Sequence, residues 1–344
     1  MNSFERTMAA ISHTQPDRVP LFLLLSLYGA KELGVPVKTY FSRPENVVNA
    51  QLRMKAKYRN DCIYTFFYAA LEVEAFGGEV IFVDDGPPNS GEPFIKSFKQ
   101  ISKIRIPKIE ETACLKRVLE ATSLLKSAVG GETPIIGVVM SPFSLPVMQM
   151  GFEKYLELMY FHAPEFEELM RLNQEFCVAW ANAQLDAGAT AICFFDPLAS
   201  PNMIERDKYL ATGHRSARQT IGRIKGPTAT HLASGIALPV IGDIIDTGTA
   251  VLGFSADDDL VEIKKAARNR ICLLGNLNGV DMVNWSADQV DEEVKNVIGK
   301  AGAGGGLILS DNHGEIPWQV PESVLMEISE AVSRHGTYPL SGNM

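Results

Sequence analysis

Short apolar runs alternate with longer stretches of helical periodicity along most of the chain. Runs that are apolar on both faces indicate strands of a buried parallel sheet, whereas apolar positions three or four apart indicate amphipathic helices. The predicted strands cover 21–25, 61–67, 134–140, 191–196, 227–231, 250–254, 272–276 and 307–310. The predicted helices cover 4–13, 44–58, 115–128, 152–187 with a break near Pro164, the segment up to 224, 235–241, 260–268, 287–301 and 321–334.

Eight strands, most of them followed by a helix, predict an α/β fold of the (β/α)₈ TIM barrel type. The stretch after the second strand carries turn signals at 77–78 and 86–89, so we expect a small hairpin insertion there. No fixed-period repeat or low-complexity linker divides residues 1–344, which favours one domain. A doubly wound open sheet is the competing architecture.

Composition narrows the classes of partner. The net charge of −9 disfavours nucleic acid and anionic membrane surfaces, and 46% hydrophobic residues suffice for a large core. No apolar run is long enough to span a membrane and the opening residues lack a signal-peptide core, so we expect a cytoplasmic protein. The five scattered cysteines indicate reduced thiols. The sequence does not decide between a monomer and a homodimer.

Polar residues gather where the predicted strands end, above all in the stretch LILSDNHGEIP at 307–317. In a barrel the carboxyl ends of all strands face one cavity, where ligands bind. The candidates at these ends are Tyr64, Phe67, Glu74, Ser141, Phe143, Asp196, His231, Asp257, Asn276, Asn278, Asp311 and His313.

Two imidazoles and several carboxylates from different strands are the composition of an open metal site. His231, His313 and Asp257 are therefore the predicted ligands of a catalytic zinc, which uses three protein ligands and one open position. The alternatives are hydrogen-bonded core histidines, an N-capping role for Asp257 and a turn role for Asp196. Motifs of nucleotide-binding loops and of serine hydrolases are absent.

Several motifs together resemble the uroporphyrinogen decarboxylase superfamily over almost the whole chain. They are DRVP at 17–20, EVEAFGGEV at 72–80, FFDPLAS at 194–200, GNLNG at 275–279 and GGGLILSDNHGEIPWQVPE at 304–322. The arginine-rich stretch that holds porphyrin carboxylates in the decarboxylase is replaced here by LFLLLSLYGAKELG, which contains no arginine. Decarboxylation of a substrate with eight carboxylates is therefore disfavoured.

The chain is more similar to the corrinoid-dependent methyltransferase branch of that superfamily. Coenzyme M methyltransferases of this branch bind zinc through an HxC pair and a later cysteine. Here the pair reads His231-Leu232-Ala233, and His313 falls near the later cysteine. Without thiolates, a zinc ion would be a harder Lewis acid, suited to polarising an oxygen that leaves as phenolate or alkoxide.

The resemblance implies transfer of a methyl group from a small aryl methyl ether to cob(I)alamin on a separate corrinoid protein, with cobalamin supplied by that partner. Tyr64, Phe67 and Phe143, which belong to an aromatic cluster that also includes Phe66 and Tyr68, would contact the aromatic substrate. Asn276, Asn278 and Ser141 would contact the cofactor, and Glu74, Asp196 and Asp311 would orient substrate or supply a proton. The alternatives are a methylcorrinoid:thiol or folate methyltransferase, a barrel that only binds ligand, and a decarboxylase.

Overall fold

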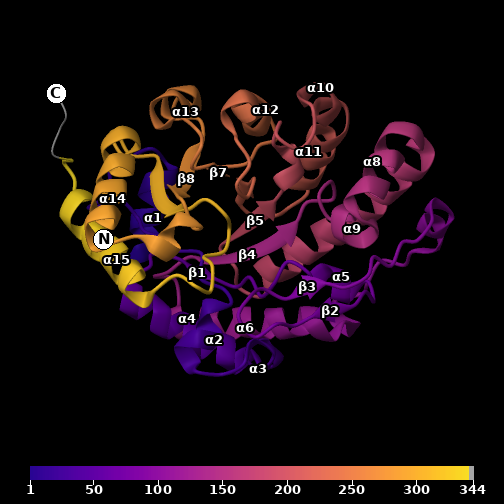
Figure 1. The fold of residues 1–344 in the computed structure, drawn as a ribbon, viewed down its shortest axis with the longest axis horizontal. Helices are drawn as coiled ribbons and strands as arrows, with labels where there is room; N and C mark the ends of the chain where they lie inside the picture. Colours follow the sequence, from indigo (N-terminus) through magenta and orange to yellow (C-terminus); the bar gives the residue numbers. More distant parts are fainter. Residues whose placement is uncertain (341–344) are drawn as a thin grey trace.

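A curled sheet of seven parallel strands forms the centre of the molecule, for which the computed structural model describes residues 1–340. The strands are paired in the order β1-β4-β5-β6-β7-β8-β9 (Figure 1). Their bounds are β1 Ile63–Tyr64, β4 Ile135–Met140, β5 Ala191–Phe195, β6 Thr228–His231, β7 Val251–Gly253, β8 Cys272–Leu277 and β9 Leu307–Asp311.

The eighth place in the barrel is taken by the extended segment 20–24, between β9 and β1. On one side, Phe22 N donates to Leu309 O at 2.9 Å, and Leu21 forms a parallel bridge with Leu309. On the other side, Asp61 N donates to Leu21 O at 2.8 Å, and the Asp61 carboxylate accepts from Leu21 N at 2.9 Å. The predicted barrel is thus confirmed, although its first strand is reduced to a single bridge.

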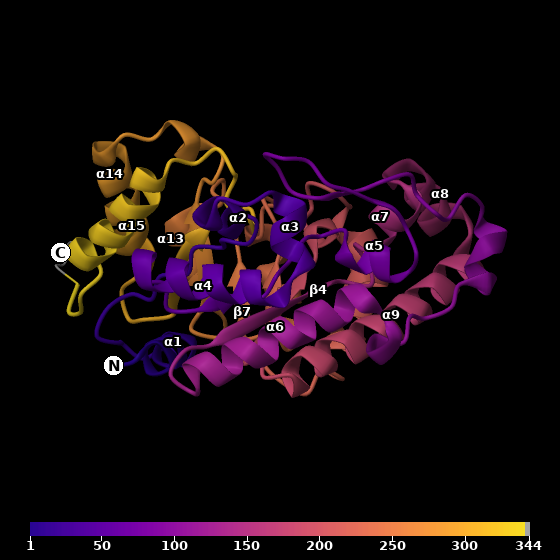
Figure 2. The same ribbon diagram turned by 90° about the horizontal axis from the view of Figure 1, so that it is seen from below.

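Helices pack around the outside of the sheet, as Figure 1 shows. They are α1 Ser3–Ile11, α2 Tyr28–Leu33, α3 Val37–Ser42, α4 Pro44–Tyr58, α5 Leu71–Ala75, α6 Ala113–Val129, α7 Pro146–Met150, α8 Phe152–Phe161, α9 Ala163–Asp186, α10 Arg206–Tyr209, α11 Arg215–Ile221, α12 Ile241–Asp246, α13 Leu260–Ala267, α14 Ala287–Ala301 and α15 Glu322–His335. Helix α8 and the beginning of α9 lie beyond the barrel at one end of the molecule, and α9 runs back from there to pack on β4 (Figure 2). Among the described residues, no helix combines the length and apolarity needed to cross a bilayer.

Two predicted helices differ from those observed. The helix expected at 235–241 begins only at Ile241, after a 3₁₀ turn at Leu238–Val240. Pro239 explains the shift, because proline lacks an N–H and disfavours a helical conformation in the residue before it. The helix expected up to 224 consists of α10 and α11 joined by a π-helical turn at Leu210–His214.

The predicted hairpin insertion is present after β1. Strands β2 (Val80–Ile81) and β3 (Asn89–Ser90) pair antiparallel, with Val80 opposite Ser90. The glycine- and proline-rich stretch between them makes the turn, as the sequence indicated.

Alternation along the strands divides the core into two parts. A larger cluster lies between the sheet and the helices, and a smaller one lies inside the barrel. The inner cluster includes Tyr64 of β1, Cys193 of β5 and Ile308 of β9, with Ala10 of α1 beside them. Helix α1 therefore packs against the amino-terminal end of the barrel, which leaves the carboxyl ends of the strands for the site.

Candidate active site at the carboxyl ends of the strands

His231 is the last residue of β6, and its side chain is fully buried. Its ring stacks on Phe195 at the end of β5, with ring centroids 5.1 Å apart and an interplanar angle of 7°. Gly253 of β7 leaves the space that the ring needs, since a β-carbon there would lie 2.7 Å from His231 Cγ. The ring is therefore held flat between two neighbouring strands.

The hydrogen bonds of His231 decide which nitrogen carries its proton. Nδ1 accepts a hydrogen bond from Ala233 N at 3.0 Å, so the neutral ring keeps its proton on Nε2. This Nε2–H is buried and has no hydrogen-bond partner among residues 1–340. Burial, with a smaller contribution from His313, lowers the pKa of His231 to about 4. At neutral pH, His231 is thus an uncharged hydrogen-bond donor.

His313 lies in the turn after β9 and interacts electrostatically with His231. Its Nδ1 contacts the hydroxyl of Ser234 from the loop after β6. Gly279 packs closely against the ring of His313. A β-carbon at this position would lie 2.9 Å from His313 Cδ2, too close for an unshifted ring. Burial lowers the pKa of His313, and within the described chain its Nε2 also lacks a partner. The barrel thus holds two neutral imidazoles whose Nε2 atoms are unpaired.

Asp311 organises the turn that carries His313. One carboxylate oxygen accepts from Leu24 N at 3.2 Å, and the other accepts from the backbone N–H groups of His313 and Gly314, each at 3.1 Å. Burial raises the pKa of Asp311 to about 6. With its oxygens occupied by backbone groups, Asp311 positions the turn and the first strand segment.

Glu315, in the same turn, is an acidic residue that is not among the predicted site residues. Its carboxylate accepts from Leu27 N at 3.1 Å and contacts the hydroxyl of Ser26. Burial raises the pKa of Glu315 to about 7, with an added contribution from Asp311. The side chain is partly exposed and close to Tyr64, whose hydroxyl donates to Gly314 O at 3.2 Å. Its place in the LILSDNHGEIP stretch was the available signal.

The predicted zinc ligands do not form a metal centre. Asp257 is exposed, and the buried carboxylate beside it is Asp258, which accepts from the N–H groups of Ala237, Leu238 and Ser255. The described residues contain no group of three or more His, Cys, Asp and Glu side chains that could hold one metal ion. A neutral His231 also presents a proton on Nε2 instead of a lone pair. The donor set therefore does not fit a three-ligand zinc.

Asp196 and Ser141 lie together outside the barrel wall. Asp196 accepts from the hydroxyls of Ser141 and Ser144, both at 2.6 Å, and its N donates to His231 O at 2.8 Å. Burial raises the pKa of Asp196 to about 6. The hydrogen bond from Asp196 N to His231 O links the carboxyl end of β5 to that of β6, next to His231.

The two predicted asparagines make structural hydrogen bonds. Asn276 Nδ2 donates to Ser255 O at 2.8 Å and so links the end of β8 to the loop after β7. The Asn278 side chain accepts from Val280 N at 3.1 Å and donates to Asp281 at 2.7 Å, which makes a local turn. Asn276 is buried and Asn278 is partly exposed.

Of the three predicted aromatic residues, only Tyr64 faces the inside of the barrel. Phe67 packs on Phe41 in the outer core, with centroids 5.4 Å apart, and Phe143 packs on Tyr155 at 6.1 Å. The expectation that Phe67 and Phe143 line the substrate site is therefore wrong. The rings of Phe66 and Phe195 instead pack against the inner cluster, stacked with centroids 6.5 Å apart and partly exposed.

Glu74 also lies away from the histidines. It accepts from Tyr68 at 2.6 Å and forms an ion pair with Arg117 of α6 at 3.2 Å. Glu72, two residues earlier on α5, is the acid that reaches a strand end: it accepts from Met140 N at 2.9 Å. Burial raises the pKa of Glu72 to about 8.

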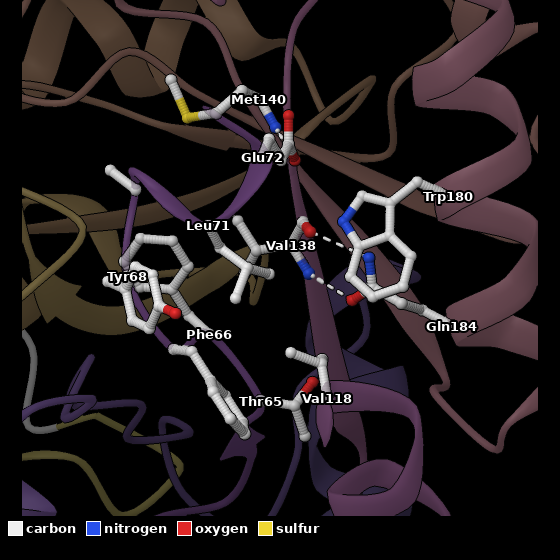
Figure 3. Close-up of a pocket in the computed structure, with 12 residues that line it drawn as sticks. Thr65, Phe66, Tyr68, Leu71, Glu72, Val118, Val138, Met140, Trp180 and Gln184 are labelled. Atoms are coloured by element: carbon white, nitrogen blue, oxygen red, sulfur yellow. Dashed lines mark hydrogen bonds between the residues drawn. The ribbon is translucent and has the colours of Figure 1, made fainter. Parts of the chain in front are cut away.

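Side chains bridge a gap in the barrel wall between β1 and β4 (Figure 3). Gln184 of α9 accepts from Val138 N at 3.0 Å and donates to Val138 O at 2.9 Å, beyond the last pairing of the two strands. Glu72 accepts one hydrogen bond, from Met140 N at 2.9 Å, and Trp180 also lines the small pocket at this gap. Glu72 and Gln184 thus replace the missing partner strand.

A family model and several individual proteins match most or about half of this chain. The sequence model of the family described as "Uroporphyrinogen decarboxylase (URO-D)" matches residues 2–335. A uroporphyrinogen decarboxylase from Saccharophagus degradans is 24% identical over 297 residues, 82% of this chain and 81% of that protein. A methylcobamide:CoM methyltransferase (MtaA) from Methanosarcina barkeri is 26% identical over 182 residues, which span 52% of this chain and 53% of that protein.

Among solved structures, a methyltransferase from Methanosarcina mazei superposes with a TM-score of 0.87 at 20% identity. The superposition covers 97% of this chain and 99% of that one. A B12-independent methionine synthase from Shewanella matches more distantly, with a TM-score of 0.54 at 11% identity over 84% of this chain and 86% of that one. At these identities the likeness establishes a shared fold.

Proposed function

The chain belongs to the uroporphyrinogen decarboxylase (URO-D) family, and from this premise we propose that it is a methyltransferase that works with a corrinoid carried by a separate protein. Two similar proteins are named as methyltransferases, one of them acting with a methylcobamide. We further propose that the methyl donor is a small aryl methyl ether.

The cations near the first strand segment argue against a porphyrin substrate. No arginine occurs between Arg18 and Arg43. Arg18 is bound to the buried Asp61 at 2.8 Å, and Lys31 donates to Trp318 O and Val320 O. A substrate with eight carboxylates would need free cations in this region.

The unpaired Nε2–H of His231 is the observation that carries the proposal. A buried donor without a partner costs free energy unless a ligand supplies an acceptor, and an ether oxygen is such an acceptor. The stacked pair Phe66 and Phe195 would contact the aromatic ring of the donor.

The residues then have distinct roles in methyl transfer. A reduced corrinoid on the partner protein would supply the electron pair for the new bond to the methyl carbon, and the electron pair of the broken carbon–oxygen bond would stay on oxygen. His231 donates its Nε2–H to that oxygen as negative charge develops there. Glu315, whose pKa of about 7 keeps part of it protonated at neutral pH, delivers a proton to the leaving oxygen. Asp311 and Asp196 hold the two turns in place.

The test compares His231→Gln with His231→Ala in methyl transfer from guaiacol- or vanillate-type ethers to reduced corrinoid protein, with zinc measured in each protein. Glutamine keeps a donor, so we expect His231→Gln to retain at least tenfold more activity than His231→Ala, with no loss of bound zinc in either. His162→Gln, at a partly exposed histidine between α8 and α9, is the matched control.

One zinc ion per chain that disappears in both His231 variants, with both equally inactive, would restore the zinc-dependent mechanism. Absence of methyl transfer from every ether tested would refute the ether donor.

A second candidate is transfer from a methylated corrinoid to a thiol. The similarity to the methylcobamide:CoM methyltransferase favours it. Methyl transfer from methylcobalamin to a thiol, with no reaction from ethers, would select this direction.

A further inference from the structure

The inside of the barrel below His231 and Tyr64 is not filled by side chains. A cavity of about 60 Å³ lies there, bounded above by these two residues and below by Thr7 and Ile11 of α1. On the same measure one water molecule needs roughly 10–15 Å³. The cavity therefore has room for several heavy atoms.

Small side chains at inward positions create this space. An eight-stranded barrel is just wide enough for side chains to fill its interior, and large branched residues dominate in such barrels. Here the walls include Cys62, Ala191, Cys193, Ala229 and Ala250. Residues of this size leave the middle of the barrel empty.

The polar groups at the cavity wall are almost all satisfied elsewhere. The Thr7 hydroxyl donates to Ser3 O at 2.8 Å, and the Thr228 hydroxyl donates to Thr249 at 3.2 Å. The Tyr64 hydroxyl donates to Gly314 O. Only His231 Nε2 remains without a partner in the described structure. Water needs two to four polar partners to occupy a buried site, so such a cavity favours apolar ligands.

We propose that the barrel interior is a binding site for a small apolar group, an aromatic ring or a short alkyl chain, with His231 at its upper end. The amino-terminal end is covered by α1, so the proposed entry is at the opposite end, where the partly exposed Phe66 and Phe195 pack against the inner cluster. The occupant is either a free apolar molecule or an apolar substituent of the substrate held at His231. The second source rests on the proposed function.

The experiment measures benzene binding to the full chain by NMR titration and by the ligand-induced rise in melting temperature. We expect saturable binding that Ala229→Leu weakens at least tenfold, because leucine fills the cavity. Ala287→Leu, the same change at the exposed first residue of α14, is the control and should bind as the native protein does.

Ile308→Ala provides a second variant, which enlarges the cavity and should improve binding of a larger ring such as indole. This variant keeps the proposal testable if Ala229→Leu fails to fold. Binding that is absent, or equal in native protein, Ala229→Leu and Ile308→Ala, would overturn the proposal.

Competition between benzene and a methyl ether then distinguishes the two sources. Benzene that raises KM without changing kcat occupies the place of a substrate substituent. Benzene that binds without affecting methyl transfer identifies a separate ligand. These two readouts require methyl transfer from an ether, whereas benzene binding to the full chain does not, so a failure of the proposed function leaves the binding result intact.

Discussion

At the scale of single residues, Gly253 decides where the His231 ring can lie. The absence of a β-carbon lets the ring turn flat against Phe195, with Nδ1 toward Ala233 N. The tautomer of His231, and with it the proposed chemistry, depends on this contact.

Gly253→Ala should therefore displace the His231 ring. We expect at least a tenfold loss of methyl-transfer activity and about 1–3 kcal/mol of destabilisation from overpacking. Activity assays and urea denaturation measure the two effects. Gly242→Ala, where a β-carbon meets nothing within 4 Å, is the control. Native activity in Gly253→Ala would show that ring placement does not matter.

Glu72 predicts a pH-dependent stability. Native Glu72 keeps its proton up to about pH 8, whereas its ordinary pKa is 4.5. Between these values the native state binds more protons than the unfolded chain, so stability falls as pH rises from 4.5 to 8 and levels off above. Glutamine resembles the protonated acid and does not titrate, so it removes this fall in stability with rising pH.

Glu72→Gln should match the native protein near pH 4.5 and exceed it at pH 8 by roughly 3–5 kcal/mol, at about 1.4 kcal/mol for each pH unit. Urea denaturation across this range measures the difference. Glu74→Gln, a change on the same helix α5 that removes the ion pair with Arg117 of α6, should keep the native pH slope. A difference that does not change with pH would contradict the prediction.

At the scale of elements, the first strand segment is held by one buried carboxylate. Asp61 is 1% exposed and accepts from Leu21 N, from Arg6 at 2.7 Å and from Arg18 at 2.8 Å. Segment 20–24 makes only one β-bridge to β9, so the Asp61 carboxylate replaces a backbone hydrogen bond that a regular strand pair would make with Leu21.

Asp61→Ala should cost about 3–5 kcal/mol, since it leaves the Arg18 guanidinium and the Leu21 N–H without their carboxylate and Arg6 with Asp17 alone. Thermal or urea denaturation gives the value. Asp17→Ala, at a side chain that is 41% exposed and also pairs with Arg6, should cost less than about 1 kcal/mol. Equal losses of stability in the two variants would show that burial of Asp61 does not strengthen the attachment of segment 20–24 to the barrel.

At the scale of the whole molecule, the five cysteines are all buried and unlinked. Burial raises the pKa of Cys62, Cys114, Cys193 and Cys272 to about 12. A charged thiol reagent should therefore react with no thiol of the native protein and with five after unfolding. Rapid labelling of native thiols would mean that the barrel interior opens to water.

The barrel and much of the candidate site could be predicted from the sequence. Helices α4 and α14 begin and end where the pattern placed them, and both histidines lie at strand ends. The two-residue period of a strand predicts that Phe66 points inward with Tyr64 and that Phe67 points outward, and the two rings lie accordingly. Glu315 was visible in the same polar run, whereas Asp257 could not be told from Asp258, since the difference lies in distant N–H groups.

The chain by itself determined the strands, the helices and the polar residues at the strand ends, because side-chain period, caps and turn residues act between near neighbours. The tertiary structure alone decided that His231 keeps its proton on Nε2, that Glu72 is buried uncharged and that small residues leave the barrel hollow. These properties depend on partners brought together from distant positions, such as Gly253 beside His231 and Met140 beside Glu72. The local sequence pattern does not predict these long-range contacts, because burial and hydrogen-bond geometry are defined only once the barrel has closed.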